Sequence, residues 1–303
     1  MDNKNKKIIV IVGPTASGKT DLSIKLAKKF KGEIISADSR QVYKGMDIGT
    51  GKVTKKEMRG IPHYLLDVIS PKKRFDVAQY KKLAEEAINR IYKKNKLPFL
   101  VGGTGFYIQA VIDNISMPKI KPDWKLRKKL EKKPIPELYK MLVKLDPNRA
   151  SNIDKNNPRR LIRALEIVLK SKRPVGPLIP QKPRFKALFL GVKKDQKELK
   201  NLIEKRLLKR LKSGMINEVK KLHRSGVSWK RLEEFGLEYR FVAQYLQKKL
   251  TYNEMIQKLE KEIEHYAKRQ MTWFKRDKRI KWIKNIKEAD KSVKNYLILT
   301  DKK

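Results

Sequence analysis

The sequence predicts an α/β fold: a P-loop nucleotide-fold core with a parallel sheet and flanking helices, plus an inserted all-helical lobe. Three observations predict it. Short β-rich runs alternate with helical periods over the first hundred residues, which is typical of a parallel sheet with crossover helices. A glycine-rich phosphate-binding loop follows the first run. A basic, strand-free stretch then separates this part from a later β-rich run.

Four short apolar runs are expected to form strands, and a fifth is expected to return to the same sheet. They are residues 7–12, 33–36, 64–69, 97–101 and 187–192. Before the fourth run, apolar residues recur at helical spacing from Val77 to Ile91, with Asp76 as the expected N-cap. The core is therefore expected to comprise residues 1–117 and 185–303, with the lobe at residues 118–184.

The phosphate loop, GPTASGKT, occupies residues 13–20. Gly13 and Gly18 let the loop fold back so that successive amides point inward. Lys19 adds a mobile ammonium, and the Thr20 hydroxyl is a ligand for Mg²⁺. This loop therefore predicts a site for a phosphorylated ligand.

The helix after this loop is marked by Leu22, Leu26 and Phe30 at helical spacing, and Gly32 is expected to cap it. In the lobe, Asn157-Pro158 is expected to begin a helix, because a cap residue precedes proline at the first helical position. Prolines then recur every third residue at 174, 177, 180 and 183, which predicts an extended connector. Further helices are expected at residues 195–212, 240–249 and 252–274.

The charge of the chain is extreme: 76 Lys and Arg against 32 Asp and Glu give a net +44 over 303 residues. This predicts salt-sensitive attraction to nucleic acid or to an anionic membrane, the alternative being a lysine-rich surface on an ordinary enzyme. No apolar run approaches the ~20 residues of a membrane-spanning helix. The absence of cysteine excludes disulfides and cysteine zinc sites. We expect a cytoplasmic monomer with no obligatory protein partner.

The strand ending at Val101 is followed by Gly102-Gly103-Thr104-Gly105, where a nucleotide hydrolase would carry an acidic residue. Asp38, directly after the second strand, is the better-placed carboxylate. Ligands of parallel α/β sheets collect beyond the carboxyl ends of the strands, so Asp38, Thr104 and the phosphate loop are expected on one edge. Asp38 suits a general base, or alternatively an N-cap or a residue beside Mg²⁺.

Six motifs resemble, in order, those of the bacterial tRNA dimethylallyltransferase (tRNA isopentenyltransferase) family over nearly the whole chain. They are GPTASGKT at 13–20, DSRQVYKGMDIGT at 38–50, PHYLLD at 62–67, GGTGFY at 102–107, DPNRASNIDKNNPRRLIRALE at 146–166 and KRQMTWF at 268–274. The resemblance implies transfer of the dimethylallyl group from dimethylallyl diphosphate to the N6 amine of the adenine 3′ of the anticodon. It further implies tRNAs that read codons beginning with U, Mg²⁺ as cofactor and diphosphate as product.

The resemblance also implies residue roles. The catalytic set is Asp38 as general base with Lys19, Thr104 and Arg206. The diphosphate set is Gly13, Pro14, Thr15, Ala16, Ser17, Gly18, Lys19 and Thr20, with Thr20 on the metal and Arg206 directed at the same diphosphate. The tRNA set is Asp38, Ser39, Arg40, Gln41 and Thr104 around the extruded adenine, with Arg127, Arg159, Arg160, Leu161, Ile162 and Arg163 on the lobe.

Two other enzyme classes compete with this interpretation. A phosphate-loop kinase for a nucleotide or a small metabolite has no use for a net charge of +44 or a basic helical insertion. A nucleic-acid-binding ATPase is disfavoured by the missing acidic residue after Val101. The chain also departs from the family pattern at Leu202 and at Gly236-Leu-Glu-Tyr-Arg240, which weakens assignments in the C-terminal half.

Overall fold

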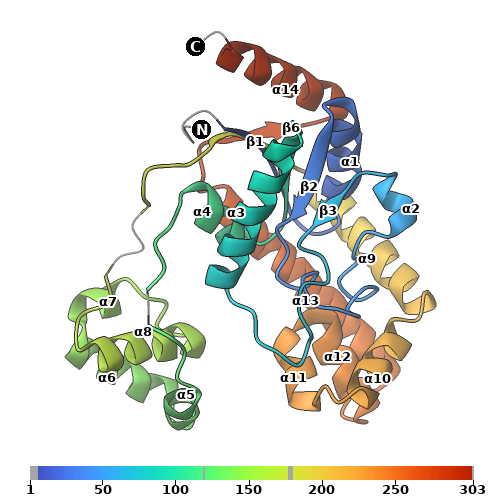
Figure 1. The fold of residues 1–303 in the computed structure, drawn as a ribbon. Coiled ribbons are helices and arrows are strands. Elements are labelled where there is room, and N and C mark those ends of the chain that lie inside the picture. The colour runs from blue at the N-terminus through green and yellow to red at the C-terminus, as the bar shows by residue number, and fades with distance from the viewer. Residues whose placement is uncertain (1–5, 119, 177–179, 302–303) are drawn as a thin grey trace. The chain divides into compact units, whose positions relative to one another are not determined.

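The structure, a computed structural model, describes residues 6–118, 120–176 and 180–301. The chain divides into two compact units (Figure 1). One comprises Met1–Asn114 with Lys182–Lys303, and the other is Ile115–Gln181. The predicted α/β core with an inserted helical lobe is confirmed.

A six-stranded, all-parallel sheet in the order β3-β2-β4-β1-β5-β6 forms the centre of the first unit. Its strands are β1 (Lys7–Val12), β2 (Gly32–Ser36), β3 (His63–Tyr64), β4 (Leu97–Gly102), β5 (Lys186–Val192) and β6 (Ile280–Ile283). In register, Val10 of β1 lies between Leu100 of β4 and Phe189 of β5. The strand after the lobe therefore returns to the same sheet, as predicted, and lies between β1 and β6.

The strand predicted at residues 64–69 is wrong beyond Tyr64. Leu65 and Asp67 have φ angles of 63° and 57°, so the chain leaves the extended conformation there. Ile69 forms an isolated bridge with Tyr43. The sequence prediction also missed β6, whose four residues, three apolar and one lysine, are too few to show a strand pattern.

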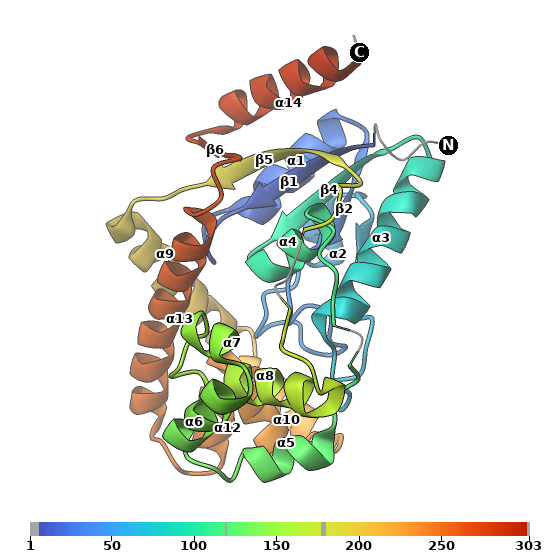
Figure 2. The same ribbon diagram turned by 90° about the vertical axis from the view of Figure 1, so that its left-hand side faces the viewer.

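Helices cover both faces of the sheet (Figures 1 and 2). Helices α3 (Val77–Lys93) and α4 (Gly105–Ile112) pack on one face, and α1 (Lys19–Lys29) and α14 (Ile286–Asp301) on the other. Within β1, alternate residues belong to the two separate cores: Val10 lies with α3 and α4, whereas Ile9 lies with α1 and α14. Burial on both faces explains why the strands are continuous apolar runs.

The helix caps were predicted with mixed success. Asp76 caps α3, accepting a hydrogen bond from the Gln79 amide. Gly32, however, does not end α1, because the cap is Phe30 and the following left-handed residue is Lys31. Gly32 instead begins β2, where a Cβ atom would lie 2.3 Å from the Phe99 ring. Close packing between strands, and not a helix turn, requires this glycine.

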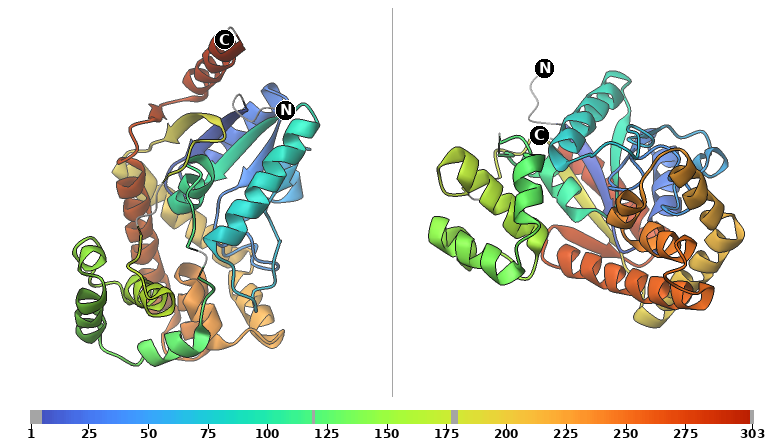
Figure 3. Two further views of the ribbon diagram at one scale, coloured as in Figure 1. Left: turned by 60° about the vertical axis from the view of Figure 1, so that its left-hand side comes forward. Right: turned by 90° about the horizontal axis from the view of Figure 1, so that it is seen from below.

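A helical bundle completes the first unit. It comprises α9 (Gln196–Lys212), α10 (Met215–Arg224), α11 (Trp229–Phe235), α12 (Leu237–Leu246) and α13 (Tyr252–Phe274), while a short α2 (Lys55–Met58) lies on the surface. The bounds predicted for α13 are confirmed, and this helix runs from the bundle up to the sheet (Figures 2 and 3). The helix predicted at 240–249 begins earlier, after Gly236 with φ 75°. Helices α10 and α11 were not predicted.

The second unit contains four helices among its described residues: α5 (Trp124–Leu130), α6 (Ile135–Leu145), α7 (Pro147–Ser151) and α8 (Pro158–Ser171). Asn157 caps α8 as predicted, accepting from the Arg160 amide at 3.2 Å. Part of the predicted proline connector, residues 177–179, lies outside the described residues. Within the first unit, Asn114 Nδ2 donates to the Lys182 carbonyl at 3.2 Å, which joins the two points between which the lobe is inserted.

Candidate active site

The phosphate loop between β1 and α1 has the backbone that its glycines predict. Gly13 and Gly18 have φ angles of 152° and 88°, and Ala16 between them also has a positive φ. A Cβ atom on Gly13 would lie 2.6 Å from the Val192 carbonyl oxygen, so a larger residue is excluded there. Because α1 begins at Lys19, its free amides and the positive end of its dipole face the loop.

Lys19 is half-buried in this loop, and its ammonium donates to the Pro14 carbonyl. Burial lowers the pKa of Lys19 to about 7; the Arg206 guanidinium adds to this effect and Asp38 opposes it. An anion bound in the loop would favour the protonated ammonium. The free protein therefore holds a lysine whose charge depends on what the loop binds.

Arg206 of α9 faces the loop, with Nη1 3.3 Å from the Thr15 hydroxyl. Burial and the neighbouring Arg210 lower the pKa of Arg206 to about 10, against the raising effect of Glu238 and Asp38. Arg210, which the sequence prediction missed, pairs with Glu238 at 2.5 Å. Arg206 and Lys19 together place two cationic groups at one phosphate loop, an arrangement suited to an anion with several charges.

Asp38 sits in the turn that follows β2. Its Oδ1 atom accepts hydrogen bonds from the amides of Arg40 at 2.8 Å and Gln41 at 3.3 Å. Within the described part of the chain, its Oδ2 atom has no hydrogen-bond partner. Thr104, at the end of β4, accepts from the Ser39 amide at 3.1 Å and donates its own amide to Ala37. The ends of β2 and β4 thus hold one carboxylate oxygen fixed and leave the other accessible.

The side chains of Gln41 and Arg40 contact different parts of the structure. Gln41 Oε1 accepts from the Ser36 hydroxyl at 3.0 Å, so its amide orientation is set. The guanidinium of Arg40 donates through Nε to the Phe235 carbonyl at 2.8 Å and lies 5.7 Å from the centre of the Phe235 ring. Arg40 therefore links the Asp38 turn to the helical bundle, a role that the sequence did not indicate.

Gln270 of α13 is a second residue that sequence reasoning missed, although it lies in the KRQMTWF motif. Its side chain accepts from the Thr15 amide at 2.8 Å and donates to the Gly103 carbonyl at 2.9 Å. Thr15 was expected to bind the diphosphate, but its amide is already used by Gln270, which leaves its hydroxyl as the group that faces Arg206. The signal was a polar residue inside an otherwise apolar helical face.

The lobe residues assigned to tRNA fall into two groups. Leu161 and Ile162 belong to the lobe core, with exposed fractions of 0% and 7%, so their side chains cannot meet an RNA. Arg127 and Arg163 donate to the buried carboxylate of Glu166. Their first role is therefore to stabilise the lobe. Arg159 and Arg160 on the same helix are exposed.

The side-chain oxygens available to Mg²⁺ lie at the phosphate loop and the Asp38 turn. Among the described residues, no three Asp, Glu, His or Cys side chains gather as a metal cluster. Thr20 is exposed in the first turn of α1, and the Asp38 carboxylate lies at the same edge of the sheet. This fits Mg²⁺, which is commonly held by one or two protein oxygens together with phosphate oxygens and water.

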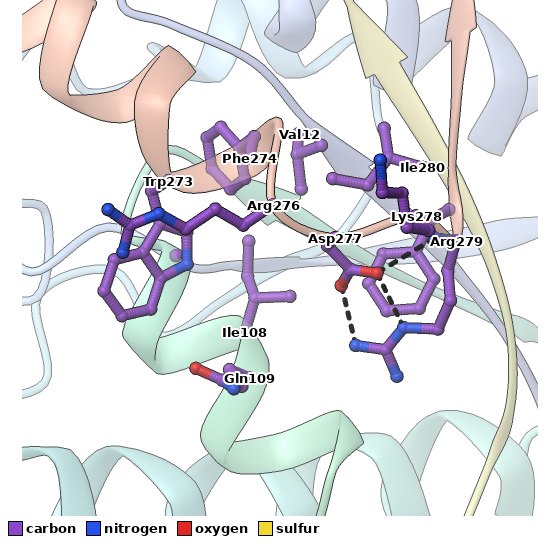
Figure 4. Close-up of a pocket in the computed structure, with 12 residues that line it drawn as sticks. Val12, Ile108, Gln109, Trp273, Phe274, Arg276, Asp277, Lys278, Arg279 and Ile280 are labelled. Atoms are coloured by element: carbon purple, nitrogen blue, oxygen red, sulfur yellow. Dashed lines mark hydrogen bonds and ion pairs between the residues drawn. The ribbon is translucent and has the colours of Figure 1, made fainter.

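A pocket of about 510 Å³ opens beside the C-terminal end of α13 (Figure 4). Trp273, Arg276 and Lys278 line it, and Asp277 pairs with Arg279 at its wall. Its described lining contains none of the residues predicted for the site. The predicted residues of the first unit instead meet at the carboxyl edge of the sheet, around the phosphate loop and the Asp38 turn.

Comparison with known proteins decides the family. A family model described as IPP transferase matches residues 41–277. A tRNA dimethylallyltransferase 1 of Syntrophus aciditrophicus is 44% identical over 277 residues, covering 90% of this chain and 91% of that protein. This chain belongs to the tRNA dimethylallyltransferase (IPP transferase) family.

Solved structures of the tRNA dimethylallyltransferase family agree with the fold. The full-length tRNA isopentenylpyrophosphate transferase of Bacillus halodurans superimposes with a TM-score of 0.73 at 36% identity, covering 97% of this chain and 96% of that one. A eukaryotic dimethylallyltransferase described as acting on tRNA gives a TM-score of 0.75 at 30% identity, covering 88% of this chain and 69% of that one. As for membranes, none of the described helices combines the length and apolarity that a bilayer-spanning segment needs.

Proposed function

We propose that this enzyme transfers the dimethylallyl group of dimethylallyl diphosphate to the exocyclic N6 amine of the adenine 3′ of the anticodon, in tRNAs reading codons that begin with U. Diphosphate is released. One observation carries the proposal: the phosphate loop, with Lys19 and Arg206, lies at the same edge of the sheet as Asp38. Only one of the two Asp38 carboxylate oxygens, Oδ1, is used in hydrogen bonds to the backbone. The family membership, which names tRNA as acceptor in the relatives, supports it.

In the proposed reaction the adenine N6 attacks the first carbon of the dimethylallyl group, and the carbon–oxygen bond to diphosphate breaks. The leaving diphosphate takes the electron pair, and Asp38 accepts the proton that N6 loses. Lys19 and Arg206 stabilise the negative charge that grows on the diphosphate as it departs. Mg²⁺, held by Thr20, would supply further charge compensation.

The acceptor must leave the anticodon loop to reach Asp38, because a base inside a stack does not expose its N6 to a protein carboxylate. Thr104 and Ser39 lie beside the carboxylate and offer hydroxyl groups to the adenine edge, while the Gln41 side chain is held by Ser36 and the Gly51 carbonyl. On the lobe, exposed Arg159 and Arg160 offer phosphate contacts. The net charge of +44 supports an RNA partner of this kind.

The test is to incubate the protein with Mg²⁺, dimethylallyl diphosphate and an unmodified tRNA with adenine 3′ of an anticodon that reads a codon beginning with U. Nucleosides are then analysed by mass spectrometry. We expect one adenosine that carries a dimethylallyl group. A matched tRNA with guanine at that position should stay unmodified. Unmodified adenosine with folded, tRNA-binding protein would overturn the proposal.

A further inference from the structure

We infer that Gln270 is a positioning residue for prenyl transfer, which aligns the loop that holds the donor with the loop that holds the base. The inference rests on the proposed function. Gln270 is 6% exposed, and both ends of its amide are used. Its Oε1 atom accepts from the Thr15 amide at 2.8 Å, and its Nε2 atom donates to the Gly103 carbonyl at 2.9 Å.

The two loops that Gln270 joins carry the two halves of the reaction. Thr15 lies in the phosphate loop, and its hydroxyl is 3.3 Å from the Arg206 guanidinium. Gly103 directly precedes Thr104, whose hydroxyl holds the amide of Ser39 beside Asp38. A single side-chain amide therefore connects the diphosphate side of the site with the carboxylate side.

The packing leaves little freedom in this connection. A Cβ atom on Gly103 would lie 2.1 Å from Gln270 Nε2, and one on Gly105 would lie 2.2 Å from the Trp273 ring. Gln270 and Trp273 are three residues apart on α13 and therefore lie on one face of this helix. That face packs against the loop after β4 at two points, Gly103 and Gly105. Earlier in α13, Ile263 and Ala267 are buried in the core of the helical bundle, which holds the helix in position.

The consequence for catalysis follows from geometry. Reacting atoms must be held in near-attack positions, and a displacement of about 1 Å costs about 100-fold in rate. Gln270 touches neither the proposed donor nor the adenine in this arrangement, since its amide is occupied by the two loops. Its loss should therefore lower kcat while leaving affinity for diphosphate nearly unchanged.

The first test compares Gln270→Met with Gln257→Ala, an exposed glutamine on the same helix. Methionine conserves the volume of the side chain but forms neither hydrogen bond. We expect kcat to fall by about 10- to 100-fold in Gln270→Met. The KM for dimethylallyl diphosphate should stay within about threefold of the value for the unaltered enzyme. So should the Kd with which the protein binds inorganic diphosphate in the presence of Mg²⁺. Gln257→Ala should match the unaltered enzyme in all three.

Two further experiments test whether the loss of kcat comes from breaking the connection between the two loops. The alternatives are the loss of a polar group at this position and misfolding of the variant. Gln270→Asn keeps the amide but is one methylene shorter and reaches only one loop, so kcat should again fall at least tenfold. Because Gln270 is argued to act through Thr104, Gln270→Met and Thr104→Val should be strongly non-additive in kcat. Melting curves check that each variant is folded.

The outcomes are distinct. Full kcat in Gln270→Met or Gln270→Asn, or a loss seen only as weaker diphosphate binding, overturns the positioning role. Additive effects in the double variant overturn the route through Thr104. Absence of transfer by the unaltered enzyme overturns the proposed function itself, and the inference with it.

Discussion

Substituting Glu166 tests whether Arg127 and Arg163 stabilise the lobe. The Glu166 side chain is fully buried and accepts four hydrogen bonds, from Arg127 Nε and Nη2, from Arg163 Nη1 and from the Asp123 amide. Glu166→Ala would leave two guanidinium groups and one amide without these bonds. Breaking a buried ion pair by removing one partner costs about 3–5 kcal/mol.

The structure places the expected loss at the lower end of that range. Arg127 and Arg163 keep exposed fractions of 21% and 32%, so water can reach their guanidinium groups once the carboxylate is gone. We expect the lobe to lose about 3 kcal/mol of unfolding free energy. For a unit of this size, that corresponds to a melting transition lower by about 12–24 °C.

The assay is differential scanning calorimetry with limited proteolysis of the lobe. The matched control is Glu137→Ala, because Glu137 makes an exposed pair with Lys133 that is worth less than about 1 kcal/mol. If Glu166→Ala destabilises the lobe no more than Glu137→Ala does, the stabilising role is refuted.

The Glu166 carboxylate also makes the stability of the lobe depend on pH. Burial raises the pKa of Glu166, but hydrogen bonds from Arg127, the Asp123 amide and Arg163 outweigh it, and the pKa lies below the ordinary 4.5. The unfolded chain therefore binds more protons near this pH, and the stability that Glu166 adds is present above pH 4.5 and lost as the pH falls below it. The Glu166→Ala variant should lack this acid-sensitive part.

Three further predictions concern the active site and the partner. Asp38→Asn should lower turnover by about 100- to 10,000-fold in the nucleoside assay while diphosphate binding measured by calorimetry is retained, and undiminished turnover would remove Asp38 from the role of base. Gly51→Ala should weaken diphosphate binding about tenfold, because its Cβ would lie 2.1 Å and 2.3 Å from the guanidinium groups of Arg210 and Arg206. Gly60→Ala, which shares a positive φ but meets no atom within 4 Å, is its control, and equal affinities in the two variants would contradict the explanation. Affinity for tRNA should fall about 1,000-fold between 50 and 200 mM salt if ~6 phosphates are contacted, and a flat salt response would argue against an RNA partner.

The parts of the fold predicted from the sequence are those marked by the spacing of apolar residues and by the residues that begin or end helices. The buried strands, the Asp76 and Asn157 caps and the bounds of α13 follow from local patterns. Gly32 shows the limit, since glycine there is required by the Phe99 ring of a neighbouring strand, 67 positions away in the chain. The strand predicted beyond Tyr64 failed because positive φ angles at Leu65 and Asp67 have no sequence signature in those residue types.

The grouping of the candidate site residues was predictable where motifs directly follow strands of the sheet. The phosphate loop, Asp38 and Thr104 lie together at the strand ends because parallel topology brings consecutive strand ends to one edge. Gln270 was not predictable, since its two partners come from loops more than 160 residues earlier. Nor was the pairing of Arg127 and Arg163 with the buried Glu166 predictable, because the sequence pattern of a basic helix residue is the same whether it faces water or a carboxylate.

The hydrogen bond between Asn114 and Lys182 holds the two insertion points of the lobe next to each other. A chain that leaves and re-enters the core at adjacent points can be shortened by a direct join, without stretching any strand of the sheet. The phosphate loop and the Asp38 turn both lie on the part of the chain that such a join would retain. The length or composition of the lobe could therefore change without altering the backbone that carries the phosphate loop and the Asp38 turn.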